Sequence, residues 1–236
     1  MLSLVESERQ RRWLSLSRVW HAVVAAVVAG SLAIQLWLIF SGGVDANSGE
    51  DGGTASILVR LWRLFSFFTV ESNVVVLVVC VLLILDPVRR GWWWDVARIN
   101  ALLAITITGL VFAVVLAPQL SFTGAALVAT VGFHYVAPWA TVVGWLVLGP
   151  RLGFQWSKIA GAFILPIAWL VYIFVQGPAT GWYPYTFLDV TEIGLGRALA
   201  NALLVLVLAL VIALVYRLLD ARVPAALEST TSTGAR

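Results

Sequence analysis

The sequence predicts an all-α integral membrane protein, built as a bundle of about six transmembrane helices. Of its 236 residues, 61% are hydrophobic and only 11% are charged, and the mean hydropathy is +0.96. These values exclude an ordinary soluble domain, which carries more charge and fewer apolar residues. The length accommodates about six apolar segments of about 20 residues with short loops between them. No soluble domain of useful size is left over.

Polar, glycine or proline positions separate the apolar runs and mark the helix ends. We expect membrane helices over residues of about 19–40, 56–85, 99–117, 124–148, 159–176 and 197–219. Proline disfavours helix in the residue before it, so Pro87, Pro118 and Pro150 mark the ends of the second, third and fourth helices. Pro166 lies inside the fifth helix and predicts a kink.

The transmembrane domain is expected over residues 19–219, between two polar segments. Residues 1–18 form a basic N-terminal segment, and residues 220–236 form a cytoplasmic tail rich in Ser, Thr and Ala that we expect to be disordered. The first apolar run is longer than the core of a signal peptide, so we interpret it as a retained first span.

The basic residues predict the orientation. They cluster in the N-terminal segment, in the loop of residues 88–98, at Arg151 and Lys158, and just after the sixth helix. The positive-inside rule then puts both termini in the cytoplasm, and we expect the membrane to be a bacterial plasma membrane. Because loop arginines explain the net charge of +3, that charge does not indicate a nucleic-acid partner.

Two groups of residues are expected at the membrane interfaces. Trp92-Trp93-Trp94 reads as an aromatic anchor in the loop after the second helix. Arg60 and Arg63 near the outer end of the second helix are exceptions to the charge rule. Their long side chains can snorkel to the outer interface or, alternatively, bind an anionic headgroup.

The polar residues of the second helix are the first candidates for chemistry, because lipid offers polar groups no hydrogen-bond partner. On one continuous helix Ser66, Thr69 and Asn73 share a face, whereas Glu71 points roughly to the other side. His134 in the fourth helix falls at a matching depth of about 12–18 Å from the outer end, at 1.5 Å per residue. We therefore expect Thr69 and His134 to meet inside the bundle.

A threonine hydroxyl next to a neutral imidazole is a candidate nucleophile–base pair, since the base can take the hydroxyl proton as the new bond forms. The alternative is that both are packing groups that bond across helices. Ser72 is the second candidate nucleophile. Asn73, Asn100 and Asn201 are candidate donors to a substrate carbonyl or, alternatively, helix-bridging residues.

Several cofactor sites are excluded by residue type. The only lysine, Lys158, lies at a membrane edge and cannot form a buried retinal Schiff base, and His21 and His134 lie at different depths, which excludes a haem held by two histidines. No cluster has the spacing of metal ligands, and no glycine-rich phosphate loop is present. Cys80 is the only cysteine, so no intramolecular disulfide can form. We expect no cofactor and no metal.

Three landmarks together resemble one family: Phe67-Phe68-Thr69 with Ser72-Asn73, His134-Tyr135-Val136-Ala137-Pro138, and the stretch Gly181-Trp182-Tyr183-Pro184-Tyr185-Thr186-Phe187-Leu188-Asp189. The chain is similar over residues of about 15–220 to the androgen-induced membrane protein family, in its bacterial branch of short six-span proteins. Animal members are threonine hydrolases that cleave fatty acid esters of hydroxy fatty acids. The resemblance implies that their intramembrane threonine and histidine correspond to Thr69 and His134. The surrounding residues follow the bacterial pattern more than the animal one.

The resulting hypothesis is a lipid ester hydrolase with Thr69 as nucleophile and His134 as base. Its substrate would be an amphiphilic ester that enters sideways from the membrane lipids. The candidate substrate-binding residues are Glu71, Ser72, Asn73, Trp182, Tyr183 and Tyr185. The alternative is a non-catalytic protein that binds a lipid or small molecule, or a transporter, in which Thr69, Glu71 and His134 ligate a headgroup or relay protons. The sequence does not indicate an oligomeric state.

Overall fold

The structure is a computed structural model that describes residues 2–50 and 53–225. In these ranges every regular element is a helix and no strand occurs. Six helical segments are long and apolar enough to cross a membrane: Ser7–Ser41, Phe68–Leu85, Trp92–Gln119, Gly124–Leu148, Trp156–Thr180 and Leu195–Arg222. The predicted all-helical bundle with six candidate spans is therefore confirmed, and the chain has the architecture of a multi-pass integral membrane protein.

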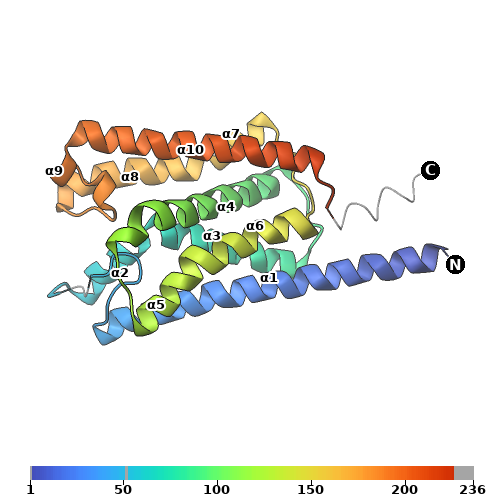
Figure 1. Cartoon of the computed structure of the whole chain (residues 1–236), viewed down its shortest axis with the longest axis horizontal. Coiled ribbons are helices and arrows are strands. Elements are labelled where there is room, and N and C mark those ends of the chain that lie inside the picture. The colour runs from blue at the N-terminus through green and yellow to red at the C-terminus, as the bar shows by residue number, and fades with distance from the viewer. Residues whose placement is uncertain (1, 51–52, 226–236) are drawn as a thin grey trace.

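The helices are labelled in Figure 1 and have the following bounds. The α-helices are α1 (Leu2–Ser41), α2 (Ile57–Ser66), α3 (Phe68–Leu85), α4 (Trp92–Val111), α5 (Gly124–Val131), α6 (Ala137–Leu148), α7 (Trp156–Ala162), α8 (Ile164–Thr180), α9 (Val190–Ile193) and α10 (Leu195–Arg222). Two π-helical turns follow α4 and α5, over Phe112–Leu116 and Gly132–Val136, and 3-10 turns cover Ala117–Gln119 and Thr186–Leu188.

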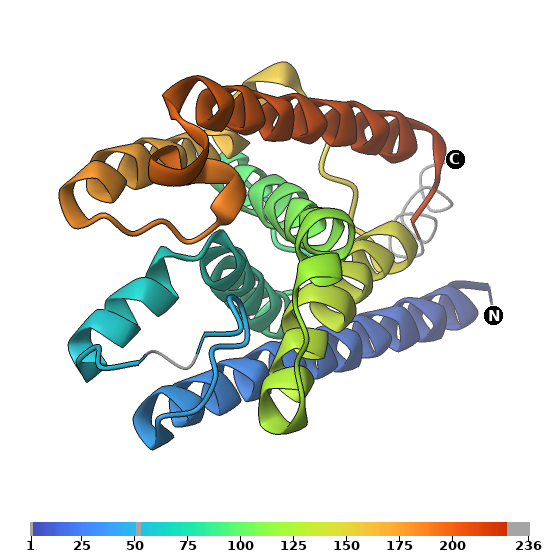
Figure 2. The ribbon, with the colours of Figure 1, turned by 60° about the vertical axis from the view of Figure 1, so that its left-hand side comes forward.

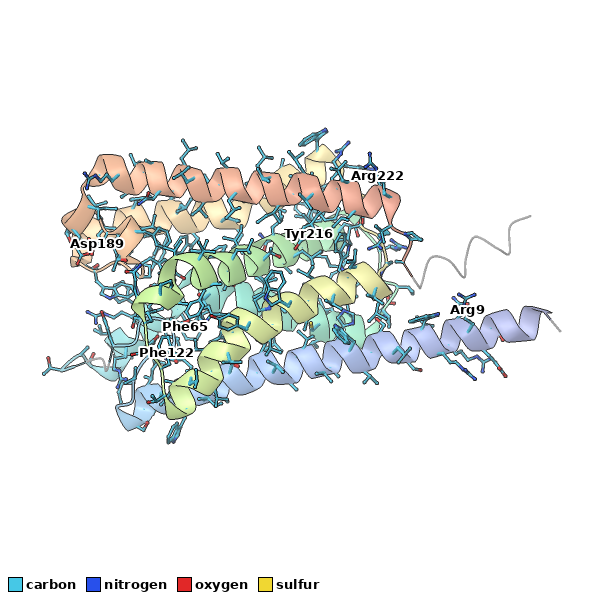
Figure 3. All side chains as sticks on the ribbon, in the orientation of Figure 1. Arg9, Phe65, Phe122, Asp189, Tyr216 and Arg222 are labelled. Carbon is cyan, nitrogen blue, oxygen red and sulfur yellow. The ribbon has the colours of Figure 1, made fainter. Side chains whose placement is uncertain are left out.

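The long helices run roughly along one axis, with α1 and α10 at opposite sides of the bundle (Figure 1). α4 is the most buried of the candidate spans, and it contacts α3, α6, α7 and α10. The start of α1 and the end of α10 lie at the same end of the bundle, as an even number of spans requires. Figure 3 shows Arg9 and Arg222 at this end, with Phe122 and Asp189 at the other.

The predicted second helix of residues 56–85 is wrong as one continuous helix. The helix is interrupted at Phe67, whose backbone is extended (φ −74°, ψ 127°). As a result α2 ends at Ser66 and α3 begins at Phe68. Phe67 is buried between the rings of Trp182 and Tyr185, at centroid distances of 5.8 and 5.6 Å. This long-range packing overrides the local helical preference. Ser66 consequently lies on another helix than Thr69 and Asn73, contrary to the predicted shared face.

Other predicted boundaries change as well. Helix α1 already begins at Leu2, so most of the N-terminal segment is helical, and α10 extends to Arg222, into the predicted tail; residues 226–236 lie outside the described part of the chain. The loop after α3 is shorter than expected because α4 starts at Trp92. Trp94 is buried at 8% exposure, so only part of the tryptophan triplet can anchor at an interface.

The predicted kink near Pro166 is present as a break at Phe163, between α7 and α8. Pro166 has no N–H, so it cannot bond the carbonyl of Ala162 four residues earlier. The amide Nδ2 of Asn100 donates to this carbonyl at 2.7 Å. Asn100 is therefore one of the expected helix-bridging residues, and Asn201, which donates to Phe187 O at 2.8 Å, is another.

Candidate functional site

Thr69 lies in the first turn of α3, directly after the break at Phe67. Its side chain is 3% exposed, and its Oγ1 lies 3.2 Å from Nε2 of His134. The two residues are 65 positions apart in the sequence. The structure thus brings the two predicted candidates into hydrogen-bonding contact inside the bundle.

His134 lies in the π-helical turn Gly132–Val136 between α5 and α6. Its Nδ1 lies 3.1 Å from the carbonyl oxygen of Thr130. A carbonyl can only accept, so Nδ1 carries the hydrogen, and in the neutral ring Nε2 presents a lone pair. The hydroxyl of Thr69 therefore donates to Nε2. This direction is the one a base needs in order to take the hydroxyl proton.

One residue of α4 and one of the π-helical turn that follows it hold the imidazole in place. Phe112 stacks on the ring of His134, with centroids 3.7 Å apart and an interplanar angle of 16°. Gly109 allows the close approach, because a Cβ there would lie 3.2 Å from the carbonyl oxygen of His134 and 3.0 Å from Pro138 Cβ. The ring is 1% exposed, so its position is fixed by packing on its faces as well as by its two hydrogen bonds.

Tyr185 completes the group of polar atoms around Thr69. It comes from the segment after α8, which passes beside the junction of α2 and α3 (Figure 2). Its Oη accepts from the backbone N–H of Thr69 at 3.2 Å and lies 3.3 Å from Thr69 Oγ1. Burial raises the pKa of Tyr185 to about 12, so the hydroxyl keeps its proton at neutral pH and can donate to Oγ1.

The directions of these bonds form one consistent chain. The N–H of Thr69 donates to Tyr185 Oη, the Tyr185 hydroxyl donates to Thr69 Oγ1, the Thr69 hydroxyl donates to His134 Nε2, and His134 Nδ1 donates to Thr130 O. The sequence predicts Tyr185 as a substrate-binding residue because of its place in the Gly181–Asp189 landmark, and it does not predict the contact with Thr69.

Ser72 and Asn73 hold the main chain of Thr69. Ser72 Oγ donates to Thr69 O at 3.0 Å and lies 2.9 Å from Thr108 Oγ1, and Asn73 Nδ2 donates to Thr69 O at 2.8 Å and to Phe133 O at 3.3 Å. Neither residue lines the cavity beside Thr69. In this arrangement both residues position the threonine. Ser72 is the second candidate nucleophile, but it contacts no histidine in the described chain.

The other candidate substrate-binding residues lie apart from the Thr69–His134 contact. Glu71 is half-buried, and its side chain makes no hydrogen bond or ion pair within the described chain. Trp182 packs on Phe67, and the Arg63 guanidinium lies 5.3 Å above its ring. Tyr183 is buried against Gly177, where a Cβ would fall 2.2 Å from its ring. Trp182 and Tyr183 thus fix the segment that carries Tyr185.

An apolar cavity adjoins Thr69. About 440 Å³ of space lies between its atoms, and part of this space is open to the surroundings. Its polar groups are the hydroxyls of Thr69, Thr108 and Tyr185. Its remaining wall is hydrophobic and comes from α3, α4, α8, α10 and the connecting segments: Phe68, Ile107, Val111, Phe112, Leu116, Trp169, Leu170, Phe187, Leu188, Ala202 and Val205.

Arg60 and Arg63 differ in their surroundings. Arg60 donates to Ile39 O and Gly43 O, both at 2.7 Å, and so binds carbonyls at the C-terminal end of α1. Arg63 stacks on Trp182, and its buried Nε has no hydrogen-bond partner in the described chain. Arg60 therefore bonds main-chain carbonyls, a contact that the sequence does not predict.

In the described residues, no three His, Cys, Asp or Glu side chains gather as a possible metal site. No family model, curated protein or solved structure matches the chain.

Proposed function

We propose that this multi-pass membrane protein is a hydrolase of lipid esters, with Thr69 as nucleophile and His134 as general base. The observation that supports this most strongly is the 3.2 Å contact between Thr69 Oγ1 and His134 Nε2, with the hydrogen held on the opposite ring nitrogen by Thr130 O. A hydroxyl becomes a useful nucleophile when an oriented base can take its proton.

The reaction follows from this contact. Thr69 Oγ1 attacks the ester carbonyl while its proton passes to His134 Nε2. The tetrahedral intermediate collapses, and the ester C–O bond breaks. The leaving alkoxide takes the proton from Nε2, so an alcohol departs and an acyl-threonine remains. Water then attacks this ester and gives a proton to Nε2. That proton returns to Thr69 Oγ1 as the carboxylic acid leaves.

The cavity supports a substrate with a hydrocarbon chain. Its wall is apolar except at the three hydroxyls, and the wall residues Val111, Leu116, Phe187 and Val205 are only partly buried. An acyl chain in this cavity would place its ester group beside Thr69. The substrate class is an amphiphilic ester that reaches the site from the membrane lipids.

The resemblance to the androgen-induced membrane protein family supports the same reading, since its animal members use one intramembrane threonine and one histidine. We further propose a bacterial plasma membrane as the location, with both termini in the cytoplasm. The basic residues Arg9 and Arg222 at one end of the bundle support this orientation (Figure 3). Thr69 would then lie in the outer half of the membrane.

The test is turnover of 4-methylumbelliferyl esters of graded acyl chain length by the purified protein in detergent micelles. Wild type should hydrolyse medium-chain or long-chain esters, and Thr69→Ala and His134→Ala should both lose this activity while keeping their thermal unfolding transition. Full activity in both folded variants would contradict the proposal. A folded wild type without turnover that retains an intact co-purified lipid would favour a binding protein instead.

A further inference from the structure

The first turn of α3 presents backbone N–H groups directly beside the candidate nucleophile. The first N–H groups of a helix have no acceptor within the helix, and the helix dipole makes this end positive. Phe67, which precedes the helix, provides no side-chain cap. The N–H of Thr69 donates instead to Tyr185 Oη at 3.2 Å.

Three aromatic rings fix the hydroxyl of Tyr185 at this place. Phe187 stacks on the Tyr185 ring at 5.4 Å, and Phe67 and Trp169 contact it at 5.6 and 5.9 Å. Tyr185 is 8% exposed. Its Oη lies 3.3 Å from Thr69 Oγ1, and Tyr185 is one of the residues that line the apolar cavity. Two hydrogen-bond donors, one from the main chain and one from a preorganised side chain, therefore lie next to the reacting oxygen.

We propose that the Thr69 N–H and the Tyr185 hydroxyl form the binding site for the negatively charged oxygen of the tetrahedral intermediate. This inference rests on the proposed ester hydrolysis. When Oγ1 bonds to the carbonyl carbon, the carbonyl oxygen lies one bond beyond that carbon, within reach of groups that already surround Oγ1. Donors aimed at this oxygen stabilise charge that develops only during the reaction.

The resting structure explains how the two donors are kept free of other acceptors. Tyr185 Oη accepts the Thr69 N–H and directs its own hydrogen to Thr69 Oγ1. As the substrate carbonyl arrives, its oxygen replaces Tyr185 Oη as the acceptor of the N–H and also accepts from the tyrosine hydroxyl. No proton leaves Tyr185 in this step, and both donors act only through hydrogen bonds.

The test is the steady-state kinetics of Tyr185→Phe, with Tyr216→Phe as the matched control. Tyr216 in α10 is about as buried as Tyr185, and its hydroxyl also contacts a threonine, 2.6 Å from Thr106 Oγ1, but Tyr216 does not line the cavity. Tyr185→Phe should lower kcat by about 10²-fold, the usual cost of one oxyanion donor, with little change in KM. Tyr216→Phe should keep the wild-type kcat.

A second readout separates this role from simple positioning. An alkyl trifluoromethyl ketone forms a reversible hemiketal with the nucleophile and carries a negative oxygen, whereas the matching alkyl ether only fills the cavity. Tyr185→Phe should weaken binding of the ketone by about the same factor by which it lowers kcat/KM, and it should leave binding of the ether unchanged. Equal weakening of both ligands, or wild-type kcat in Tyr185→Phe, would overturn the assignment.

Thr69→Ala, measured in the same series, keeps the two proposals apart. If Thr69→Ala abolishes turnover and Tyr185→Phe does not lower it, the oxyanion assignment fails and the proposed hydrolase stands. If folded Thr69→Ala retains turnover, both fail.

Discussion

The two histidines of the chain have nearly the same local environment. His21 in α1 is 6% exposed and His134 is 1% exposed. In each, Nδ1 contacts the carbonyl oxygen four residues earlier, at 2.7 Å from Ser17 O and 3.1 Å from Thr130 O. Both rings therefore carry their hydrogen on Nδ1 when neutral and present Nε2 as an acceptor.

The difference lies at Nε2. His134 Nε2 meets the hydroxyl of Thr69, whereas in the described chain no hydroxyl lies within hydrogen-bonding distance of His21 Nε2. His21 lines a separate cavity with Cys80, Arg98 and Thr141, and the Thr141 hydroxyl donates to Ala137 O. A helical turn orients a histidine, but packing between distant segments decides whether it has a partner to activate.

The largest expected effect separates the two histidines by activity. Thr69→Ala and His134→Ala should each lower kcat/KM for a long-chain umbelliferyl ester by about 10³-fold or more, as loss of a nucleophile or its base does. His21→Ala should stay within about threefold of wild type, because it removes no group from the site. An equal loss in His21→Ala and His134→Ala would show that both histidines act through the fold.

A smaller effect is expected from the two asparagines that bridge helices. Asn73→Ala and Asn100→Ala each leave a buried carbonyl with fewer donors and should lower the free energy of unfolding by about 1–3 kcal/mol. Of these two asparagines, only Asn73 bonds the main chain of Thr69, so only Asn73→Ala should also lower kcat, by about tenfold. Thermal unfolding and turnover of both variants give the comparison. Loss of kcat in Asn100→Ala as well would contradict the positioning role of Asn73.

A larger side chain on α10 should reduce the space in the cavity. Ala202 is 5% exposed and lines the cavity, whereas its neighbour Leu203 is 61% exposed. Ala202→Phe should raise KM for long-chain esters by about tenfold and leave the acetyl ester unaffected, because overpacking removes space for the chain. Leu203→Phe is the control and should leave the chain-length preference unchanged. The same preference in Ala202→Phe as in wild type would mean that the acyl chain lies elsewhere.

The smallest expected effect is on the alkaline stability. Burial raises the pKa of Tyr185 from 10.0 to about 12, so folding favours the protonated hydroxyl. This contribution is complete below pH 10 and is lost as the pH rises through about 12. Chemical unfolding at pH 8 to 11 should show a steeper loss of stability in wild type than in Tyr185→Phe. The same dependence of the free energy of unfolding on pH in both proteins would mean that folding does not favour the neutral form of this hydroxyl.

The number of spans and the Thr69–His134 contact could be predicted because both depend on position along a helix. Hydropathy and proline positions give the spans, and a rise of 1.5 Å per residue matches the depths of the two side chains. The break at Phe67 could not be predicted, because it depends on Trp182 and Tyr185, more than 100 residues later.

The contacts of Tyr185, Ser72 and Asn73 could not be predicted either, because they also depend on how distant segments pack. All three were predicted to face a substrate, but two of them bond the main chain of Thr69, and Tyr185 contacts its hydroxyl. A residue type and its helical position do not indicate which partner a distant segment brings. The carbonyl of Ala162, left free by Pro166 and bonded by Asn100, is a further case of this kind.

The most direct test of the central claim is covalent labelling of the purified protein with a fluorophosphonate probe, followed by mass spectrometry to locate the modified residue. An activated hydroxyl attacks the probe, whereas an ordinary packing threonine does not. The account predicts a label on Thr69 that is lost in His134→Ala and retained in His21→Ala. A folded wild type that stays unlabelled, or a label on Ser72 that persists in Thr69→Ala, would contradict it.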